Sequence, residues 1–321
     1  MDRLYIVVPC YNEEEVITET AARLKAKLEQ LMFEGLVSDT SRILFVNDGS
    51  RDGTWQKITD LHAQCPLYSG VNLSRNRGHQ NALLAGLMTA RERCDVCISM
   101  DADLQDDIGT MDSMLQEYRE GCDIVYGVRS ERKTDTRLKR ITAEGFYKFM
   151  RAMGVDTVYN HADYRLMSKR ALDALGEYGE VNLYLRGMVP LVGFKSACVP
   201  YARGERFAGE SKYPFKKMLA LAFDGITSFS VKPIRLVTVL GAVIFGVSLI
   251  MILYFIIRNA LGYTIEGWTT LACSIWAIGG IQILSLGVIG EYVGKIYHET
   301  KRRPRYIIES ILDGRDTEAA L

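Results

Sequence analysis

Short apolar runs alternate with helix-like segments over the first part of the chain. The runs cover residues 4–9, 43–48, 71–74, 96–101 and 123–128, and each is nearly continuous rather than interrupted at every second position. Strands that are covered on both faces show runs of this kind. Segments with helical spacing lie between them, for example 14–35 and 78–93. This order predicts an α/β fold with a mostly parallel sheet flanked by helices.

The chain becomes strongly apolar after residue 230. Two runs, 236–257 and 268–290, contain no charged residue. At about 1.5 Å per residue the first run reaches roughly 33 Å, which matches the hydrocarbon core of a bilayer. Lysines and arginines flank the pair on both outer sides, whereas the loop between the runs has only Arg258. The pattern predicts two transmembrane helices with both chain ends in the cytoplasm; the alternative is a pair of buried core helices.

These changes in composition divide the chain into four parts. We expect a cytoplasmic α/β domain at 1–211, a juxtamembrane interfacial helix at 212–230, the two spans within 231–294 and a cytoplasmic tail at 295–321. The stretches 136–154 and 212–229 mix basic residues with aromatic and aliphatic ones. Such segments either lie flat on a membrane or pack as amphipathic helices on the sheet, and the sequence leaves both open.

Charge and cysteine usage exclude two classes of protein. Lys and Arg number 39, as do Asp and Glu, so the net charge is zero and nucleic acid is not expected as a partner. Cys94 and Cys97 form a lone CxxC among seven scattered cysteines, which favours buried strand thiols over a metal site. No GxGxxG follows the first apolar run, and this weakens a dinucleotide-binding interpretation.

An acidic pair follows the run at 96–101. Asp101 and Asp103 are two residues apart, so in an extended segment they point to the same side with Cα atoms about 7 Å apart. They lie at the carboxyl end of a predicted central strand, where open α/β sheets place their ligands. Two hard oxygen ligands at this place suit Mg²⁺ or Mn²⁺. A solvated acidic loop is the alternative.

Polar residues follow the neighbouring strands at the same predicted edge. They include Asp48, which offers an acceptor for the N–H of a nucleotide base or, alternatively, serves a turn. Gly78 precedes a predicted helix start and allows close approach of backbone to a phosphate. After the first strand stand Pro9, Tyr11, Asn12 and Glu13.

Five segments in order, PCYNEEE, NDGSRDGT, LSRNRGHQNALLAGL, DADLQDD and RFAGESKY, resemble the family 2 glycosyltransferases of GT-A fold. Within that family the chain is similar to the polyprenyl-phosphate glycosyltransferases, a group that includes bacterial bactoprenol glucosyltransferases and dolichol-phosphate mannose synthases. The similarity extends across both apolar runs. It implies a GT-A, Rossmann-like sheet and an inverting transfer of a sugar from a nucleotide to a lipid phosphate.

The resemblance assigns roles by position. Asp163, in ADYRLMSK, matches the proposed catalytic base, although Ala162 replaces the usual glycine before it. Because a phosphate monoester is largely ionised at pH 7, we expect Asp163 to orient groups rather than remove a proton; a buried salt bridge with Arg165 is its structural alternative. Metal and diphosphate contacts fall to Asp101, Ala102, Asp103 and Gln105. Donor contacts fall to Pro9, Tyr11, Asn12, Glu13, Val46, Asp48, Gly78 and Arg129, and lipid-phosphate contacts to Arg206, Ser211 and Lys212.

The function that the resemblance implies is transfer of a hexose, best assigned as glucose, from a UDP-sugar to undecaprenyl or another polyprenyl phosphate for cell-surface glycan modification. Mannose or another hexose remains open as the donor sugar. The same resemblance implies a bacterial inner-membrane protein and a homo-oligomer, with a tetramer suspected. A processive polysaccharide synthase is disfavoured because LYLRGM, at 183–188, has no tryptophan after its arginine. A non-catalytic membrane scaffold or receptor is the alternative from another class, and a flippase is disfavoured by the two runs.

Overall fold

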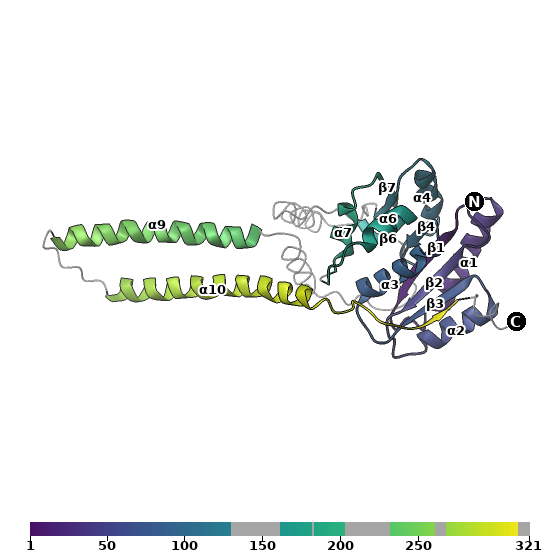
Figure 1. Cartoon of the computed structure of the whole chain (residues 1–321), viewed down its shortest axis with the longest axis horizontal. Helices are drawn as coiled ribbons and strands as arrows, with labels where there is room; N and C mark the ends of the chain where they lie inside the picture. Colours follow the sequence, from purple (N-terminus) through teal and green to yellow (C-terminus); the bar gives the residue numbers. More distant parts are fainter. Residues whose placement is uncertain (130–160, 182, 203–231, 261–267, 314–321) are drawn as a thin grey trace. The chain divides into compact units, whose positions relative to one another are not determined.

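The computed structural model describes residues 1–129, 161–181, 183–202, 232–260 and 268–313. The chain divides into two compact units. One comprises residues 1–147, 156–213 and 303–321, and the other comprises residues 148–155 and 214–302. The first unit holds an eight-stranded sheet (Figure 1). The second holds two long helices, α9 (Lys232–Ala260) and α10 (Trp268–Lys301).

The sheet is mixed, with the order β7-β5-β6-β4-β1-β2-β3-β8. Neighbours are parallel in the pairs β4–β1, β1–β2, β2–β3 and β5–β7, and antiparallel in β5–β6, β6–β4 and β3–β8. The expected α/β sheet flanked by helices is therefore present, but two strands run against the others. The strands are β1 (Leu4–Cys10), β2 (Arg42–Asn47), β3 (Tyr68–Leu73), β4 (Val96–Ser99), β5 (Ile124–Arg129), β6 (His161–Ser168), β7 (Ser196–Tyr201) and β8 (Ile308–Leu312).

Helices cover both faces of the sheet, as continuous apolar strands require. Residues of the helices on one face form a single buried cluster with Ile6 and Phe45. On the opposite face α3 lies so close that a Cβ on Gly86 would come within 2.5 Å of the Val7 side chain. The helices of this unit are α1 (Ile17–Phe33), α2 (Thr54–Gln64), α3 (His79–Arg91), α4 (Thr110–Arg119), α6 (Lys169–Gly176) and α7 (Leu185–Leu191).

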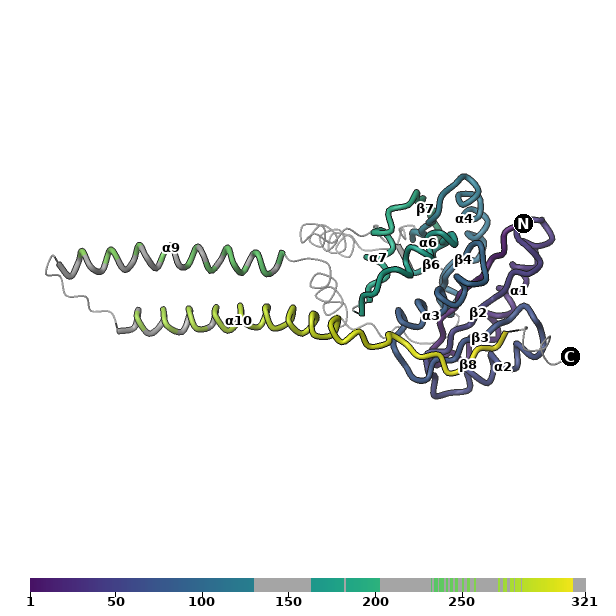
Figure 2. Tube along the Cα trace, viewed as in Figure 1, coloured from purple at the N-terminus to yellow at the C-terminus, as the bar shows by residue number. Residues whose placement is uncertain are grey.

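The topology gathers chain segments at one edge of the sheet. Strands β1 to β5 and β7 all end at this edge, and because β6 is antiparallel, it begins there. Ser99 of β4 pairs with Arg165 of β6, so the start of β6 faces the segment after β4. β8 pairs with β3 and is the last strand of the sheet, at the opposite end of the strand order from β7 (Figure 2). The sequence analysis did not assign β6, β7 or β8.

The prediction of two membrane spans, and with it the inner-membrane location, is wrong. In the parts of α9 and α10 that the structure describes, no helix is both long enough and apolar enough to cross a membrane. The apolar run expected to end at residue 290 also does not end a helix. Helix α10 continues through Glu291 and Lys295 to Lys301, so charged side chains lie within the same helix.

Candidate active site

Hydrogen bonds join the loop after β1 to the loop after β2. The N–H of Asn12 donates to Ser50 Oγ at 3.0 Å, and Asn12 Oδ1 accepts from the N–H of Arg51 at 2.9 Å. Asn12 has a positive φ of 54°, a conformation that asparagine adopts more readily than most residues. The N–H of Glu13 donates to Thr54 Oγ1 at 3.0 Å. Tyr11 is 41% exposed beside this joint, so the loop pair offers an open aromatic ring on a fixed backbone.

Two more residues that are predicted to contact the nucleotide sugar lie inside the sheet. Pro9 and Val46 are paired across β1 and β2, and both are buried. Their side chains therefore shape the floor beneath the loops.

Both carboxylate oxygens of Asp48 accept hydrogen bonds from the backbone of the loop after β3. Oδ1 accepts from the N–H of Arg77 at 2.7 Å, and Oδ2 accepts from the N–H of Gly78 at 2.9 Å. Burial raises the pKa of Asp48, and these two backbone hydrogen bonds oppose the rise. The buried Asp48 thus fixes the 77–78 loop, which is the turn-forming role left open by the sequence.

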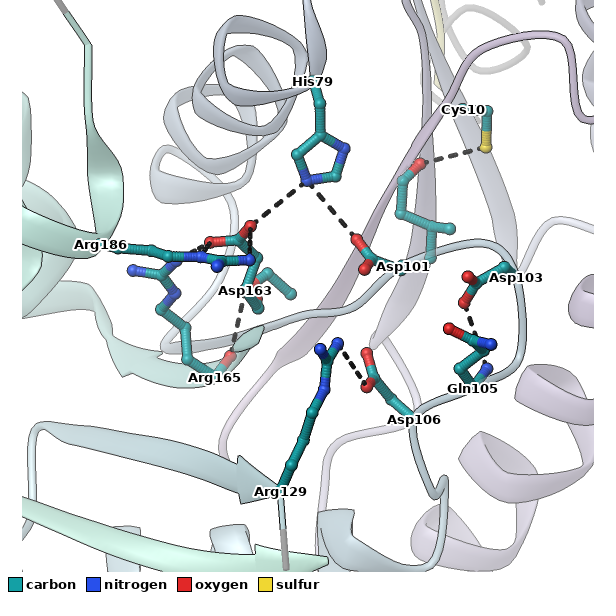
Figure 3. Close-up of polar contacts among 12 residues, drawn as sticks. Cys10, His79, Asp101, Asp103, Gln105, Asp106, Arg129, Asp163, Arg165 and Arg186 are labelled. Atoms are coloured by element: carbon teal, nitrogen blue, oxygen red, sulfur yellow. Dashed lines mark hydrogen bonds and ion pairs between the residues drawn. The ribbon is translucent and has the colours of Figure 1, made fainter. Parts of the chain in front are cut away.

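The acidic segment follows β4 directly. Asp101 Oδ1 is buried and makes no hydrogen bond, while His79 Nε2 lies 3.5 Å from it. Ala102 is buried, and its carbonyl accepts from Thr20 Oγ1 at 2.8 Å. Asp103 Oδ1 accepts from the N–H of Gln105 at 3.2 Å. These hydrogen bonds hold the segment in one conformation, in which Asp101 points toward His79 and Asp103 toward Gln105 (Figure 3).

A divalent cation fits the chemistry of these donors. Two carboxylates and the Gln105 amide oxygen are hard ligands, and the buried Oδ1 of Asp101 accepts no hydrogen bond, with His79 as its charged neighbour at 3.5 Å. Among the residues that the structure describes, no three His, Cys, Asp or Glu side chains gather as a ready-made metal site. The predicted cation ligands comprise two carboxylates, Asp101 and Asp103, and the amide oxygen of Gln105.

Asp163, at the start of β6, is the centre of a buried charge cluster (Figure 3). Arg165 Nη2 lies 2.5 Å from its Oδ1, and Arg186 contacts both oxygens at 3.3 and 3.1 Å. His79 Nε2 lies 3.6 Å from Oδ2. His79 opens α3 and Arg186 is in the first turn of α7, so three elements far apart in the sequence meet on one carboxylate. The salt bridge with Arg165, the structural alternative for Asp163, is present.

The cluster shifts the pKa values of its members. Burial raises the pKa of Asp163, but His79, Arg186 and Arg165 outweigh it and hold that pKa well below its usual range. Burial lowers the pKa of His79, yet Asp163 and Asp101 raise it overall. Burial also raises the pKa of Asp101, opposed by His79. Asp163 is thus a weak proton acceptor, whereas His79 tends to carry a positive charge between the two carboxylates.

A second polar group lies beside the acidic segment. Asp106 is buried, and Tyr201, at the end of β7, donates its hydroxyl to Oδ1 at 2.5 Å. Arg129 Nε donates to the same hydroxyl at 3.1 Å, and its Nη2 lies 3.8 Å from Asp106 Oδ1. Burial and the nearby Asp101 raise the pKa of Asp106 to about 6. Arg129 is thereby held close to the acidic segment.

The structure brings most predicted residues to one edge and adds others. His79, Asp106, Arg186 and Tyr201 received no role from the sequence, and among them His79 offered a signal, since it directly follows Gly78 at a predicted helix start. Arg186 and Tyr201 depend on segments whose elements were not assigned. Three predicted lipid-phosphate residues lie outside the described residues: Arg206, Ser211 and Lys212.

Comparison with known proteins shows the family to which the chain belongs. Residues 5–176 match the model of glycosyl transferase family 2, and residues 232–296 match that of the GtrB C-terminal hairpin. An uncharacterized glycosyltransferase of Bacillus subtilis, YkoT, is 54% identical over 95% of this chain and 91% of its own. A prophage bactoprenol glucosyl transferase homolog of Escherichia coli is 39% identical over 96% and 99%, and the bactoprenol glucosyl transferase of Shigella phage SfX is 38% identical over 96% and 99%.

Among solved structures, glucosyl-3-phosphoglycerate synthase of Mycobacterium tuberculosis is 15% identical over 70% of this chain and 76% of its own, with a TM-score of 0.45. That similarity is too distant to bear on function. The family match, in contrast, covers more than half of the chain, and relatives of 38% identity or more cover nearly all of it. The chain is therefore a glycosyltransferase and belongs to glycosyl transferase family 2.

Proposed function

We propose that this chain transfers glucose from UDP-glucose to a polyprenyl phosphate of the bactoprenol type, with inversion at the anomeric carbon. One observation carries the proposal. The relatives named bactoprenol glucosyl transferases match 96% of the chain, and the chain also matches the GtrB C-terminal hairpin over residues 232–296. A resemblance restricted to the sheet would support only transfer from a nucleotide sugar.

The loops after β1 and β2 form the proposed binding site for the nucleotide, which we call the nucleotide seat. Tyr11 offers a ring face to the base, and Asn12 and Glu13 offer polar groups on a backbone held by Ser50 and Thr54. Pro9 and Val46 form the floor. Asp48 contributes indirectly, because its oxygens hold the 77–78 loop. Gly78 then brings backbone close to a bound phosphate.

Asp101, Asp103 and Gln105 are the residues that would hold Mg²⁺ or Mn²⁺. A cation bound there supplies positive charge to the diphosphate as it departs. Arg129 is held near the same segment by Tyr201 and adds a fixed positive charge on the protein side. The acidic segment would bind the diphosphate only through that cation, and Arg129 would orient the diphosphate directly.

In the proposed reaction an acceptor phosphate oxygen forms the new bond to the anomeric carbon while the bond from that carbon to the diphosphate oxygen breaks. UDP leaves with the bonding electron pair. The acceptor has a second pKa near 6, so at pH 7 it arrives largely as the dianion and no proton has to be removed. The low proton affinity of Asp163 agrees with this requirement. We assign Asp163 the task of holding Arg186 and His79 toward the reacting groups.

The test uses the purified full-length chain, radiolabelled UDP-glucose, undecaprenyl phosphate and Mg²⁺ or Mn²⁺. We expect label in the organic phase, a loss of about 100-fold or more in Asp103→Asn, and loss in EDTA. Asp60→Asn is the matched control, because Asp60 lies on α2 away from this edge. Parallel reactions with GDP-mannose and other UDP-hexoses identify the donor. A wild-type chain that labels no lipid with any donor, or labels it equally in EDTA, would contradict the proposal.

A further inference from the structure

A chain of polar side chains, one carboxylate and two amides, crosses the sheet from β8 to the loop after β2. Asn47 ends β2 and Asn72 stands opposite it on β3. Asn47 Nδ2 donates to Asn72 Oδ1 at 2.7 Å, and Asn72 Nδ2 donates to Glu309 Oε2 at 2.9 Å. We refer to Glu309, Asn72 and Asn47 as the amide ladder. It joins segments more than 230 positions apart in the sequence.

Glu309 reaches Asn72 because β8 contains a bulge. Asn72 pairs with Ser310, and the next residue, Leu73, pairs with Ile308, so Glu309 is the extra residue between them. Pairing resumes beyond it, where the N–H of Ser74 donates to the carbonyl of Ile307 at 3.0 Å. A bulge re-aims the side chain of the residue it inserts. Here it turns a carboxylate toward the amide of Asn72.

The ladder continues into the proposed nucleotide seat. Asn47 is buried, and its Oδ1 accepts from the N–H of Ser50 at 3.3 Å. Ser50 Oγ in turn accepts from the N–H of Asn12 at 3.0 Å. The position of Asn12 therefore depends on Ser50, and the position of Ser50 depends on which way the Asn47 amide faces.

A carboxylate at the outer end determines the direction of every bond in the ladder. An ionised Glu accepts hydrogen bonds and donates none, whereas an asparagine amide does both. Glu309 therefore attracts the Nδ2 of Asn72, which leaves Asn72 Oδ1 facing Asn47. Asn47 must then present Nδ2 to Asn72 and Oδ1 to Ser50. With either amide reversed, two donors or two acceptors would face each other inside the sheet, at the cost of an unpaired buried polar group.

We propose that Glu309 is a positioning residue for the nucleotide seat, acting through Asn72 and Asn47 on the loop that holds Asn12. The inference rests on the proposed function for the identity of the ligand, a nucleoside diphosphate bound at Asn12 and Tyr11. Strand β8 then has a purpose beyond covering the edge of β3. It fixes the polarity of the side-chain hydrogen bonds that lead to the loop holding Asn12.

Steady-state kinetics with UDP-glucose as the varied substrate provide the first test. In Glu309→Ala we expect KM to rise about threefold, and in Asn72→Ala about tenfold, with kcat changed less than twofold, since these are the losses typical of one exposed and one partly buried hydrogen bond. Glu309→Gln keeps an acceptor and should restore the wild-type KM. Ser310→Ala, an exposed neighbour on the same strand, is the control. The double variant should be no worse than Asn72→Ala, because both break one ladder.

Hydrogen exchange read by mass spectrometry tests the ladder without reference to activity. Peptides covering Asn12 and Ser50 should exchange faster in Glu309→Ala and Asn72→Ala than in wild type, Glu309→Gln or Ser310→Ala. Unchanged exchange in both alanine variants overturns the inference, as does a fall in kcat at constant KM. A wild-type chain that transfers no sugar overturns the proposed function instead, and exchange still decides whether the ladder positions the loop. A variant that does not fold is replaced by Glu309→Lys, in which a donor replaces the acceptor and exchange should again rise.

Discussion

The two sides of the sheet edge are held in different ways. After β1 and β2, side chains such as Asn12 and Asp48 bind backbone N–H groups of neighbouring loops. Around β6, Asp163 binds the charged side chains of Arg165 and Arg186 and lies beside His79. The first side buries a single carboxylate, Asp48, among neutral N–H donors, whereas the second side buries charges of both signs together. The loops can therefore lose one bond and persist, but the charge cluster depends on every member.

The magnitudes support this distinction. A typical hydrogen bond contributes about 0.5–1.5 kcal/mol net, because water would otherwise replace the partner. A buried ion that loses its partner costs about 3–5 kcal/mol, because neither water nor another charge compensates it. Arg165 is 1% exposed, so it belongs to the second case.

The largest expected effect is on folding stability in Asp163→Ala. This change leaves the buried Arg165 and the mostly buried Arg186 facing each other without a carboxylate. We expect the free energy of unfolding to fall by about 3–5 kcal/mol, measured by denaturant titration. Glu19→Ala is the matched control, since it breaks an exposed pair with Arg23 and should cost less than about 1 kcal/mol. Equal losses in the two variants would remove the distinction between the two sides.

Acid should weaken the charge cluster specifically. The pKa of Asp163 is held well below its usual value, so its pairing stabilises the fold above the unfolded-state pKa of about 3.9 and is lost as pH falls through the folded-state pKa. The stability gap between wild type and Asp163→Asn should stay level from about pH 6 to 5 and narrow below about pH 4. Both proteins carry His79→Gln, because removal of Asp163 would otherwise lower the raised pKa of His79 and add the titration of the imidazole to the gap. A gap that widens in acid would contradict the assignment.

The variant Gly78→Ala tests the side of the sheet edge that the loops after β1, β2 and β3 form, which we call the loop side. Gly78 has φ 87° and ψ 151°, a region that essentially only glycine occupies, although an added Cβ would meet nothing within 4 Å. The cost is therefore backbone strain of about 1–3 kcal/mol, together with a shift of the N–H that Asp48 binds. Gly179→Ala, with equally open space and no positive φ, should be close to neutral. We expect a lower melting temperature and a raised KM for UDP-glucose only in Gly78→Ala, and similar behaviour of the two variants would show that the conformation at Gly78 is not required.

The loop side was largely predictable from the sequence because its contacts are local to motifs. The apolar runs predicted β1 and β2 within a residue or two of their observed bounds, and the polar residues directly after them had to lie at the same edge of a parallel sheet. The acidic pair after β4 was placed by the same reasoning. The pairing of Asp48 with backbone, by contrast, requires knowledge of where the third loop returns.

Apart from the salt bridge between Asp163 and Arg165, the charge cluster was not predictable, because its geometry depends on an antiparallel insertion. A mostly parallel sheet was expected, and a parallel strand in place of β6 would begin at the opposite edge from Asp101 and carry Asp163 there. Insertion of β6 between β4 and β5 reverses its direction and brings Asp163 to the site. Arg186 reaches the cluster from α7, a helix too short and too irregular in its spacing to stand out. Nothing local to either residue signals the partner.

The smallest effect expected within the charge cluster separates charge from shape. Arg186→Lys keeps a positive charge near Asp163 but removes the two-point contact that the guanidinium makes with both oxygens. We expect about a tenfold fall in kcat/KM for lipid glucosylation, with little change in melting temperature, because Arg165 still neutralises Asp163. Arg91→Lys, on an exposed pair with Glu92, is the control. An unchanged rate would mean that Asp163 needs only a nearby positive charge, and the directed geometry assigned to the cluster would then have no role in the reaction.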